Sequence, residues 1–260
     1  MLRTMTASIA CFLAVCCAFA PAPSRGAPGD DNGWIPLIGD DPLAAWRTPT
    51  GGWFEAGGAR IDPKNARKLV PVDGKGVIIN GRSGRTTNLL TRVSFGDVEA
   101  HFEFLVPRGS NSGVKFEGLY EIQIVDSHGV ARPRATHSGG IYPRAELLPR
   151  YHYLDEGTPP KVNAARPAGE WQTLDVIFQA PRFDGSGKKI ADARFDKVVL
   201  NGQIIHQDVA VKTPTGHAWH NREIPRGPIL LQADHGPVAF RNIRVRPLVR
   251  SDDPAGQSKP

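Results

Sequence analysis

The feature that most constrains the fold of this chain is an alternation of apolar and polar residues that recurs throughout the sequence after residue 27. The alternating runs are bounded by Gly, Pro, Asn and Asp. No stretch there sustains apolar residues at the i, i+3, i+4, i+7 spacing of an amphipathic helix. A period of two places successive side chains on opposite faces of an extended strand. The sequence therefore predicts an all-β fold.

The pattern predicts nine strands and one tight hairpin. In residues 98–106 the apolar side chains share one face, whereas Glu99, His101 and Glu103 share the face that meets water or a ligand. Asn201-Gly202 stands between two alternating runs, which is the strongest short-range signal for a two-residue hairpin. The predicted strands are residues 76–80, 98–106, 113–116, 120–125, 171–179, 193–200, 203–211, 229–233 and 238–247.

The N-terminal residues predict a secretory signal peptide at 1–26. Arg3 precedes an apolar run at 9–20, and small residues that include Ser24 and Gly26 follow it. The apolar run is shorter than the roughly 20 residues of a membrane span. We therefore expect export to the periplasm or the extracellular space, with no membrane span in the mature chain.

All three cysteines, Cys11, Cys16 and Cys17, lie inside this segment. The mature chain is therefore expected to hold no thiol and no disulfide, so a hydrophobic core must stabilise it. A lipid anchor on Cys16 is not expected, because Val15 stands where acylation sites prefer a small residue.

Length and charge suit one exported sandwich domain without a nucleic-acid partner. We expect the domain at residues 33–248, between disordered segments at 27–32 and 249–260. The formal charge of +6 is scattered along the chain, with no block of Lys and Arg and no interleaved aromatic stripe. We therefore expect no binding to nucleic acid. Nothing in the sequence indicates an oligomeric state.

Two long stretches without a regular pattern, residues 126–171 and 212–227, separate predicted strands. Loops of this length in a compact domain are usually functional or disordered. The alternatives here are a binding rim and loops that only cover a sheet edge. Aromatic and hydrogen-bonding residues favour the rim: Tyr142, Tyr151, His152 and Tyr153 in the first stretch, and His217, Trp219 and His220 in the second.

The segment 111–129 holds the clearest candidates for chemistry. A period of two puts Glu121 and Gln123 on one face of a strand, and Asp126 joins them only if a bulge adds a residue. Two carboxylates on one face can supply a general acid and a base or nucleophile. The spacing is similar to the Glu-x-Asp-x-x-Glu strand of laminarinase-like glycosidases, but Gln123 cannot ionise, which disfavours double displacement. The alternative is ordinary outward-facing strand polarity.

Ordered motifs over about residues 33–248 resemble the 3-keto-disaccharide hydrolase domain family. They include Asn-Ser-Gly-Val at 111–114, Tyr-Glu-Ile-Gln-Ile-Val-Asp at 120–126, Gly-Gly-Ile-Tyr at 139–142, Gly-Pro-Ile-Leu-Leu-Gln at 227–232 and Asp-His-Gly at 234–236. The resemblance implies a two-sheet antiparallel jelly-roll sandwich of the concanavalin A-like kind. It also implies export and action on saccharides whose glucose unit carries a ketone at carbon 3.

A carbonyl at carbon 3 acidifies the proton on carbon 2, so a base can form an enolate that expels the glycosidic oxygen from carbon 1. Such a site needs a base, an enolate stabiliser and an acid. The resemblance implies Glu121, Asp126 and His235 for proton transfer, and Lys115, Gln123 or a divalent cation for the oxyanion. His235 is open to three interpretations: a base, a metal ligand or a hydrogen-bonded turn residue. No compact motif such as His-Glu-x-x-His is present, so no metal ligand is assigned.

The resemblance also implies a set of side chains that hold sugar hydroxyls or stack on a pyranose ring. Among them, Trp171 has an alternative role in the core and Asn111 an alternative role as a turn former. Two other functions stay open: a noncatalytic carbohydrate-binding module and a conventional glycosidase. The implied substrate-binding residues are Arg108, Asn111, Tyr142, Asn163, Trp171 and Gln232.

Overall fold

The computed structural model describes residues 32–249, which form two antiparallel sheets packed face to face. The predicted signal peptide and nearly all of the segments predicted to be disordered lie outside the described residues. Within residues 32–249 there is no α-helix, and no helix long and apolar enough to cross a membrane. These features confirm the predicted all-β, two-sheet antiparallel sandwich.

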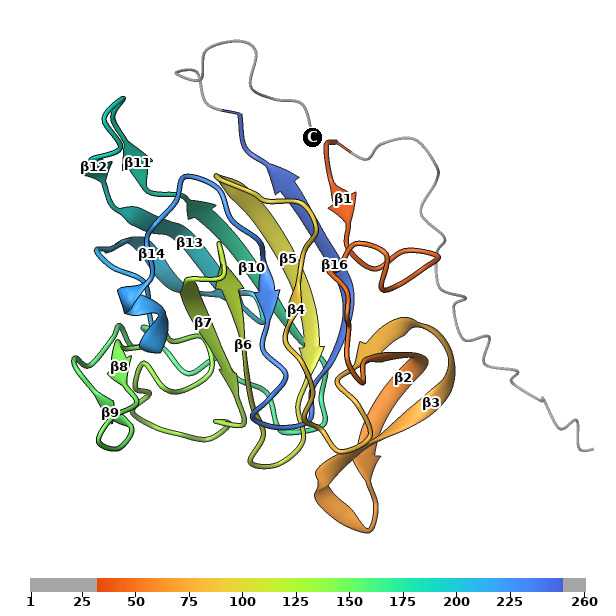
Figure 1. Ribbon diagram of the computed structural model, residues 1–260. Coiled ribbons are helices and arrows are strands. Elements are labelled where there is room, and N and C mark those ends of the chain that lie inside the picture. The colour runs from red at the N-terminus through yellow and green to blue at the C-terminus, as the bar shows by residue number, and fades with distance from the viewer. Residues whose placement is uncertain (1–31, 250–260) are drawn as a thin grey trace, which may run out of the picture. The chain divides into compact units, whose positions relative to one another are not determined.

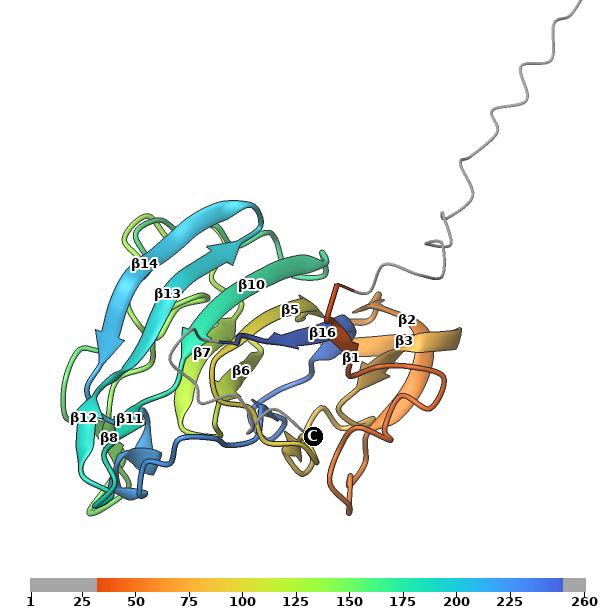
Figure 2. The same ribbon diagram turned by 90° about the horizontal axis from the view of Figure 1, so that it is seen from above.

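The large sheet runs in the order β14-β13-β10-β5-β16-β3-β2, with β1 added on β16. Figure 1 shows it behind the small sheet, and Figure 2 shows how its strands curve past β6 and β7. Its strands are β1 (Ile35–Pro36), β2 (Phe54–Asp62), β3 (Asn65–Ile79), β5 (Val98–Leu105), β10 (Gln172–Gln179), β13 (Ala193–Leu200), β14 (Gln203–Val211) and β16 (Ala239–Pro247).

The small sheet has the order β4-β15-β6-β7, and two short hairpins and one helical turn lie outside both sheets. Its strands are β4 (Leu89–Leu90), β15 (Leu230–Leu231), β6 (Asn111–Phe116) and β7 (Tyr120–Val125). The remaining elements are β8 (Ala145–Glu146), β9 (His152–Tyr153), β11 (Arg182–Phe183), β12 (Lys189–Ala191) and the 3-10 helix η1 (His217–His220).

An aromatic cluster joins the two sheets. Phe116 of β6 stacks on Phe178 of β10 with ring centroids 5.0 Å apart, and it meets Phe195 of β13 edge-on at 5.6 Å. Phe102 of β5 approaches the same ring at 6.3 Å. Offset and edge-to-face contacts of this kind add about 0.5–1.5 kcal/mol per pair beyond the burial of the rings. Because Phe116 is central to the cluster, the face of β6 that carries it is the core face.

All nine predicted strands occur, and the predicted hairpin is confirmed. Asn201 and Gly202 both have positive φ, 51° and 80°, as a type I′ turn requires. The polar face predicted for β5 is also present, and its side chains form cross-strand pairs. His101 Nδ1 lies 2.6 Å from Asp175 Oδ1 of β10, and Arg241 Nε of β16 lies 2.6 Å from Glu103 Oε2.

The hairpin of β2 with the first part of β3 was not predicted from the sequence. Register shifts between Ala56 and Gly58 and between Ile61 and Asp62 interrupt the period of two in β2, and most of the first part of β3 is exposed. The two strands approach so closely at Gly57 that a Cβ there would overlap the backbone of Asp73 and Gly74. A glycine at this position permits the close approach but removes the side chain from which a strand pattern is recognised.

Glu117, in the turn between β6 and β7, is a buried carboxyl without a partner. The residue is 4% exposed, and within residues 32–249 neither carboxyl oxygen accepts a hydrogen bond. Burial raises the pKa of Glu117 to about 8, and the nearby negative charge of Glu223 adds to the shift. The side chain is therefore protonated in the folded protein at neutral pH.

We predict that Glu117 makes the protein less stable as the pH rises. Below about pH 4.5 the group is protonated in both states, whereas between about 4.5 and 8 only the folded state keeps the proton. The contribution of Glu117 to the free energy of unfolding therefore falls across this interval. Urea denaturation at pH 5 and pH 9 should show that Glu117→Gln weakens the pH dependence and stabilises the protein at pH 9. The exposed Glu156→Gln is the matched control, and an equal effect of both substitutions would refute the assignment.

Candidate active site

A cavity of about 420 Å³ opens on the face of the small sheet that points away from the core. Its volume lies in the range of small-molecule sites. Side chains of β6 and β7 form its floor, and the two long loops predicted as a binding rim contribute Tyr142, Tyr151, Tyr153 and His217 to its walls. Seven of the catalytic and substrate-binding candidates from the sequence also line it: Asn111, Lys115, Glu121, Gln123, Tyr142, Gln232 and His235.

The floor of the pocket holds a buried ion pair. Lys115 of β6 stands directly opposite Glu121 of β7 in the antiparallel register, and Lys115 Nζ lies 2.9 Å from Glu121 Oε2. The two residues are only 8% and 3% exposed. Because β6 and β7 alternate with a period of two, both side chains leave the face opposite Phe116 and Tyr120. The pair therefore lies on the pocket side of the small sheet, and the core lies on the other side.

Glycine gives the Glu121 carboxylate its space. Gly113 lies opposite Gln123, two pairs along from Lys115, and a Cβ on Gly113 would overlap the carboxylate of Glu121. Gly216 passes on the other side, where an added Cβ would come within 3.9 Å of Lys115 Nζ and 4.0 Å of Glu121 Oε2. A side chain at position 113 would therefore displace the Glu121 carboxylate, whereas a Cβ at position 216 would only come into van der Waals contact with the ion pair.

The segment at 139–142 runs along the free edge of β7 and brings a tyrosine to the pocket. Gln123 N donates to Gly140 O, and Tyr142 N donates to Glu121 O, at 2.9 and 3.1 Å. The Tyr142 hydroxyl lies 3.0 Å from that of Tyr151 and 3.1 Å from that of Tyr153. Burial, with these two hydrogen bonds, raises the pKa of Tyr142, so its phenol stays protonated.

Two buried amide oxygens in the pocket wall have no donor. Within residues 32–249, Asn111 Oδ1 and Gln232 Oε1 are enclosed and accept no hydrogen bond. Leaving a buried acceptor unpaired costs about 1–3 kcal/mol, so such atoms are rare in folded proteins. Both residues line the cavity, where donors on a ligand would meet them. Saccharide hydroxyl groups are donors of this kind.

Asp234 and His235 form a second polar pair at the pocket. His235 Nδ1 lies 2.6 Å from Asp234 Oδ1, and both side chains are about half exposed. The carboxylate accepts the Nδ1–H, which leaves Nε2 as the acceptor of the imidazole. The loop that carries the pair is anchored by the buried Asn80, whose Nδ2 donates to Ala233 O at 3.0 Å and Gly236 O at 2.7 Å.

The structure does not bring Asp126 to Glu121. The pairing of β6 with β7 is regular from Asn111 to Phe116, so the bulge that would move Asp126 onto the pocket face is not present. Asp126 lies instead in a separate hollow together with Arg108, and its Oδ2 accepts the Gly109 N–H at 3.1 Å. The alternation along β7 therefore turns Asp126 away from the pocket, and Arg108, in the connection between β5 and β6, lines the same separate hollow.

Two of the implied sugar-binding residues also lie away from the pocket. Asn163 Nδ2 donates to Ser127 O and Val130 O at 2.7 and 3.0 Å, which holds two loops together. Trp171 packs under the guanidinium of Arg241, with 4.1 Å between the guanidinium carbon and the ring centroid. Both residues therefore make contacts within the protein, as the alternative role of Trp171 anticipated.

Other pocket residues were missed because no local pattern marks them. Asn88, Leu147 and Gly216 come from unrelated segments, and only the folded chain assembles them, whereas Asp234 lies in the Asp-His-Gly motif but was given no role of its own. Among the described residues, no group of three or more His, Cys, Asp or Glu side chains is placed to hold a metal ion.

Comparison with known proteins gives a family and a fold. A family described as the 3-keto-alpha-glucoside-1,2-lyase-like domain matches residues 33–246. No curated protein matches the chain.

Three crystal structures of candidate glycosyl hydrolases from Parabacteroides distasonis are similar to this chain. The first is 25% identical, covers 89% of this chain and 94% of its own, and has a TM-score of 0.58. The second is 20% identical with coverages of 83% and 99% and a TM-score of 0.52. The third is 16% identical with coverages of 84% and 95% and a TM-score of 0.50. The second and third show the fold alone.

We predict that replacing both members of the ion pair on the pocket floor destabilises the protein less than replacing Lys115 alone. Lys115→Met leaves Glu121 as a buried charge without its partner, which should lower the free energy of unfolding by about 3–5 kcal/mol. Adding Glu121→Gln removes that charge and should recover much of the loss. Guanidinium denaturation at pH 7 measures both effects.

The more exposed pair of Arg144 with Asp155 serves as the control, because Arg144→Met should cost about 1 kcal/mol or less. A Lys115→Met variant as stable as the parent protein would contradict the prediction. A double variant no more stable than Lys115→Met alone would do so as well.

Proposed function

The chain belongs to the 3-keto-alpha-glucoside-1,2-lyase-like domain family, and from that premise we propose that it cleaves the glycosidic bond of 3-keto-glycosides by elimination followed by hydration. The family makes it a carbohydrate-acting enzyme of the hydrolase or lyase type. We propose a glycoside or disaccharide with a ketone at carbon 3 as its specific substrate.

The reaction has two stages. In the first, a base removes the proton from carbon 2, the enolate collapses to a double bond between carbons 1 and 2, and the glycosidic oxygen leaves with a proton from an acid. In the second, water adds its oxygen to carbon 1 and carbon 2 regains a proton. The net change is hydrolysis, and an enzyme that stops after the first stage is a lyase.

The observation that carries the proposal is the buried Lys115–Glu121 pair beside two acceptors that have no donor. An ammonium group held in an enclosed site stabilises negative charge more strongly than one in water. Lys115 is therefore assigned to the enolate oxygen on carbon 3, with Glu121 holding the ammonium in position. Asn111 Oδ1 and Gln232 Oε1 supply acceptors for hydroxyl groups of the sugar.

Proton transfer is assigned to the remaining polar groups of the pocket. His235 takes the proton of carbon 2 on Nε2, and Asp234 stabilises the imidazolium that forms. Tyr142 gives its phenolic proton to the leaving oxygen. In the second stage the phenolate takes a proton from the incoming water, and the imidazolium of His235, whose proton exchanges with solvent, returns a proton to carbon 2. Both residues end in the state in which they began.

Substrate turnover tests the proposal directly. The purified protein should release product from a 3-keto-glucoside and none from its unoxidised parent, and product formed in heavy water should carry deuterium on carbon 2. Parallel assays with a chelator show whether a divalent cation takes part. Turnover of the unoxidised glycoside would favour a conventional glycosidase, and binding without turnover of either compound would favour a noncatalytic module.

Paired substitutions test which carboxylate belongs to the site. Glu121→Gln and His235→Asn should each lower kcat by about 100-fold or more, the range in which loss of acid, base or electrostatic assistance falls. Asp126→Asn should leave kcat almost unchanged, because Asp126 lies in the separate hollow. A loss for Asp126→Asn as large as that for Glu121→Gln would contradict this assignment.

We also propose that the enzyme acts outside the cytoplasm, on the strength of the N-terminal sequence. Sequencing the N-terminus of the protein recovered from its native cells should find a chain that begins near residue 27. Recovery of a cytoplasmic protein that still begins at residue 1 would refute this proposal.

A further inference from the structure

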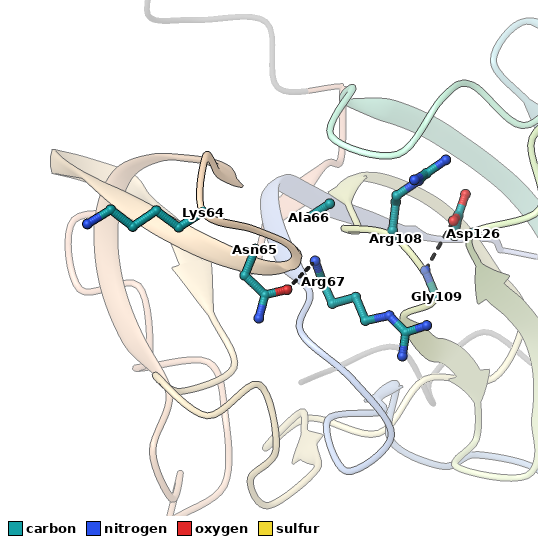
Figure 3. A pocket seen from close by; sticks show the side chains of 7 residues that line it. All are labelled: Lys64, Asn65, Ala66, Arg67, Arg108, Gly109 and Asp126. Carbon is teal, nitrogen blue, oxygen red and sulfur yellow. Dashed lines mark hydrogen bonds between the residues drawn. The ribbon is translucent and has the colours of Figure 1, made fainter.

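A second hollow, lined by cationic side chains, lies at the end of β6 and β7 (Figure 3). Its volume is about 510 Å³, within the range of small-ligand sites. The hollow lies between the turn that joins β2 to β3 and the segment that joins β5 to β6. Its lining residues are Lys64, Asn65, Ala66, Arg67, Arg108, Gly109 and Asp126.

Backbone hydrogen bonds hold the two sides of this hollow together. Arg108 N donates to Ala66 O at 2.9 Å, which joins the hairpin turn to the start of the β5–β6 connection. On the hairpin side, Arg67 N donates to Asn65 Oδ1 at 3.0 Å. The two arginines therefore project from ordered backbone that brings them to one hollow.

The charge of the hollow is unbalanced. Arg67 and Arg108 are exposed, and neither forms an ion pair within residues 32–249. Figure 3 shows Lys64 directed away from the other lining residues, with the guanidinium groups of Arg67 and Arg108 on opposite sides of Gly109. Asp126 supplies the one carboxylate among the lining residues, and its Oδ2 accepts a hydrogen bond from the Gly109 N–H. A guanidinium presents a planar fork of donors that matches a carboxylate or another oxyanion.

The hollow is next to the candidate active site along the chain. Gly109 lines the hollow, Asn111 lines the pocket, and two residues of extended chain span at most about 7 Å. Ser110, between them, is buried, and its Oγ donates to Pro237 O at 2.6 Å. The loop that carries His235 packs at the same place, because a Cβ on Gly236 would overlap Ser110 and the Asn111 backbone.

We propose that this basic hollow is a second saccharide subsite that binds a carboxylate group on the part of the substrate that extends from the pocket. The enzyme would then prefer glycosides of uronic acids to neutral glycosides. The inference relies on the proposed function only in naming a saccharide as the ligand. Binding, and not turnover, is therefore the property to measure.

The probes are a glucosyl-glucuronate disaccharide and the matching glucosyl-glucose disaccharide, with affinities measured by calorimetry on the whole protein. The acidic disaccharide should bind about tenfold more tightly, as one charge-assisted contact predicts. The preference should shrink between about 0.01 M and about 1 M salt, because the Debye length falls from about 30 Å to about 3 Å.

Substitutions locate the subsite. Arg67→Gln with Arg108→Gln should lower the affinity for the acidic disaccharide to that for the neutral one. Arg132→Gln with Arg222→Gln removes the same charge from exposed positions outside the hollow and should keep the preference. Asp126→Asn should strengthen binding of the acidic disaccharide, because it removes a like charge and keeps an acceptor for Gly109.

The inference is overturned if both disaccharides bind equally, including the case in which neither binds. It is also overturned if the double substitution in the hollow keeps the preference. The proposed function is judged separately, by turnover of an uncharged 3-keto-glucoside by the unsubstituted protein, because that substrate has no carboxylate for the hollow to bind. A protein that binds the uronate but turns over no keto-glucoside would retain the subsite and lose the proposed function.

Discussion

The antiparallel pairing of β6 with β7 is the constraint on which the rest of the site depends. In a regular pair every second residue points to the same face, so one face takes Phe116 and Tyr120 into the core. The opposite face then takes Lys115, Glu121 and Gln123 into the pocket. A slip of one residue would exchange the two sets and place charges against the aromatic cluster. Packing of the aromatic residues in the core therefore fixes the register of β6 with β7, and this register places the polar side chains in the pocket.

The surroundings of Lys115 and Glu121 offset the cost of burying two charged side chains. Taking two charges out of water is costly, and only good geometry with further hydrogen bonds offsets it. Here the partners stand opposite each other at 2.9 Å, and the absence of a side chain at Gly113 leaves space for the Glu121 carboxylate. The same enclosure strengthens the field of the ammonium at the pocket. The Lys115–Glu121 ion pair is thus both a contact within the fold and the source of a candidate catalytic group, the Lys115 ammonium.

The pocket and the basic hollow, which both lie beside β6, are assigned different roles: the pocket carries out the reaction, and the hollow recognises charge. The pocket carries the imidazole, the phenol and the held ammonium that the proposed elimination needs, whereas the neighbouring hollow carries two arginines that form no ion pair with any residue from 32 to 249. The short run from Gly109 to Asn111 joins them. A substrate that reaches from one to the other would be recognised by its charge at a distance from the reacting bond. This arrangement lets specificity change without altering the residues assigned to the reaction.

The sequence by itself determined the all-β class, the main strands, the Asn201-Gly202 turn and the shared face of Glu121 and Gln123. These features are local, because side-chain period and turn conformation are decided within a few residues. It did not determine the hairpin at residues 54–75, because register shifts interrupt the alternation of β2 and most of the first part of β3 is exposed. Only the tertiary structure decided that Asp126 and Arg108 leave the pocket, that Asn163 and Trp171 contact the protein itself, and that Tyr151 and Tyr153 reach Tyr142. Those outcomes depend on register and on contacts between segments far apart in the chain, which no local pattern encodes.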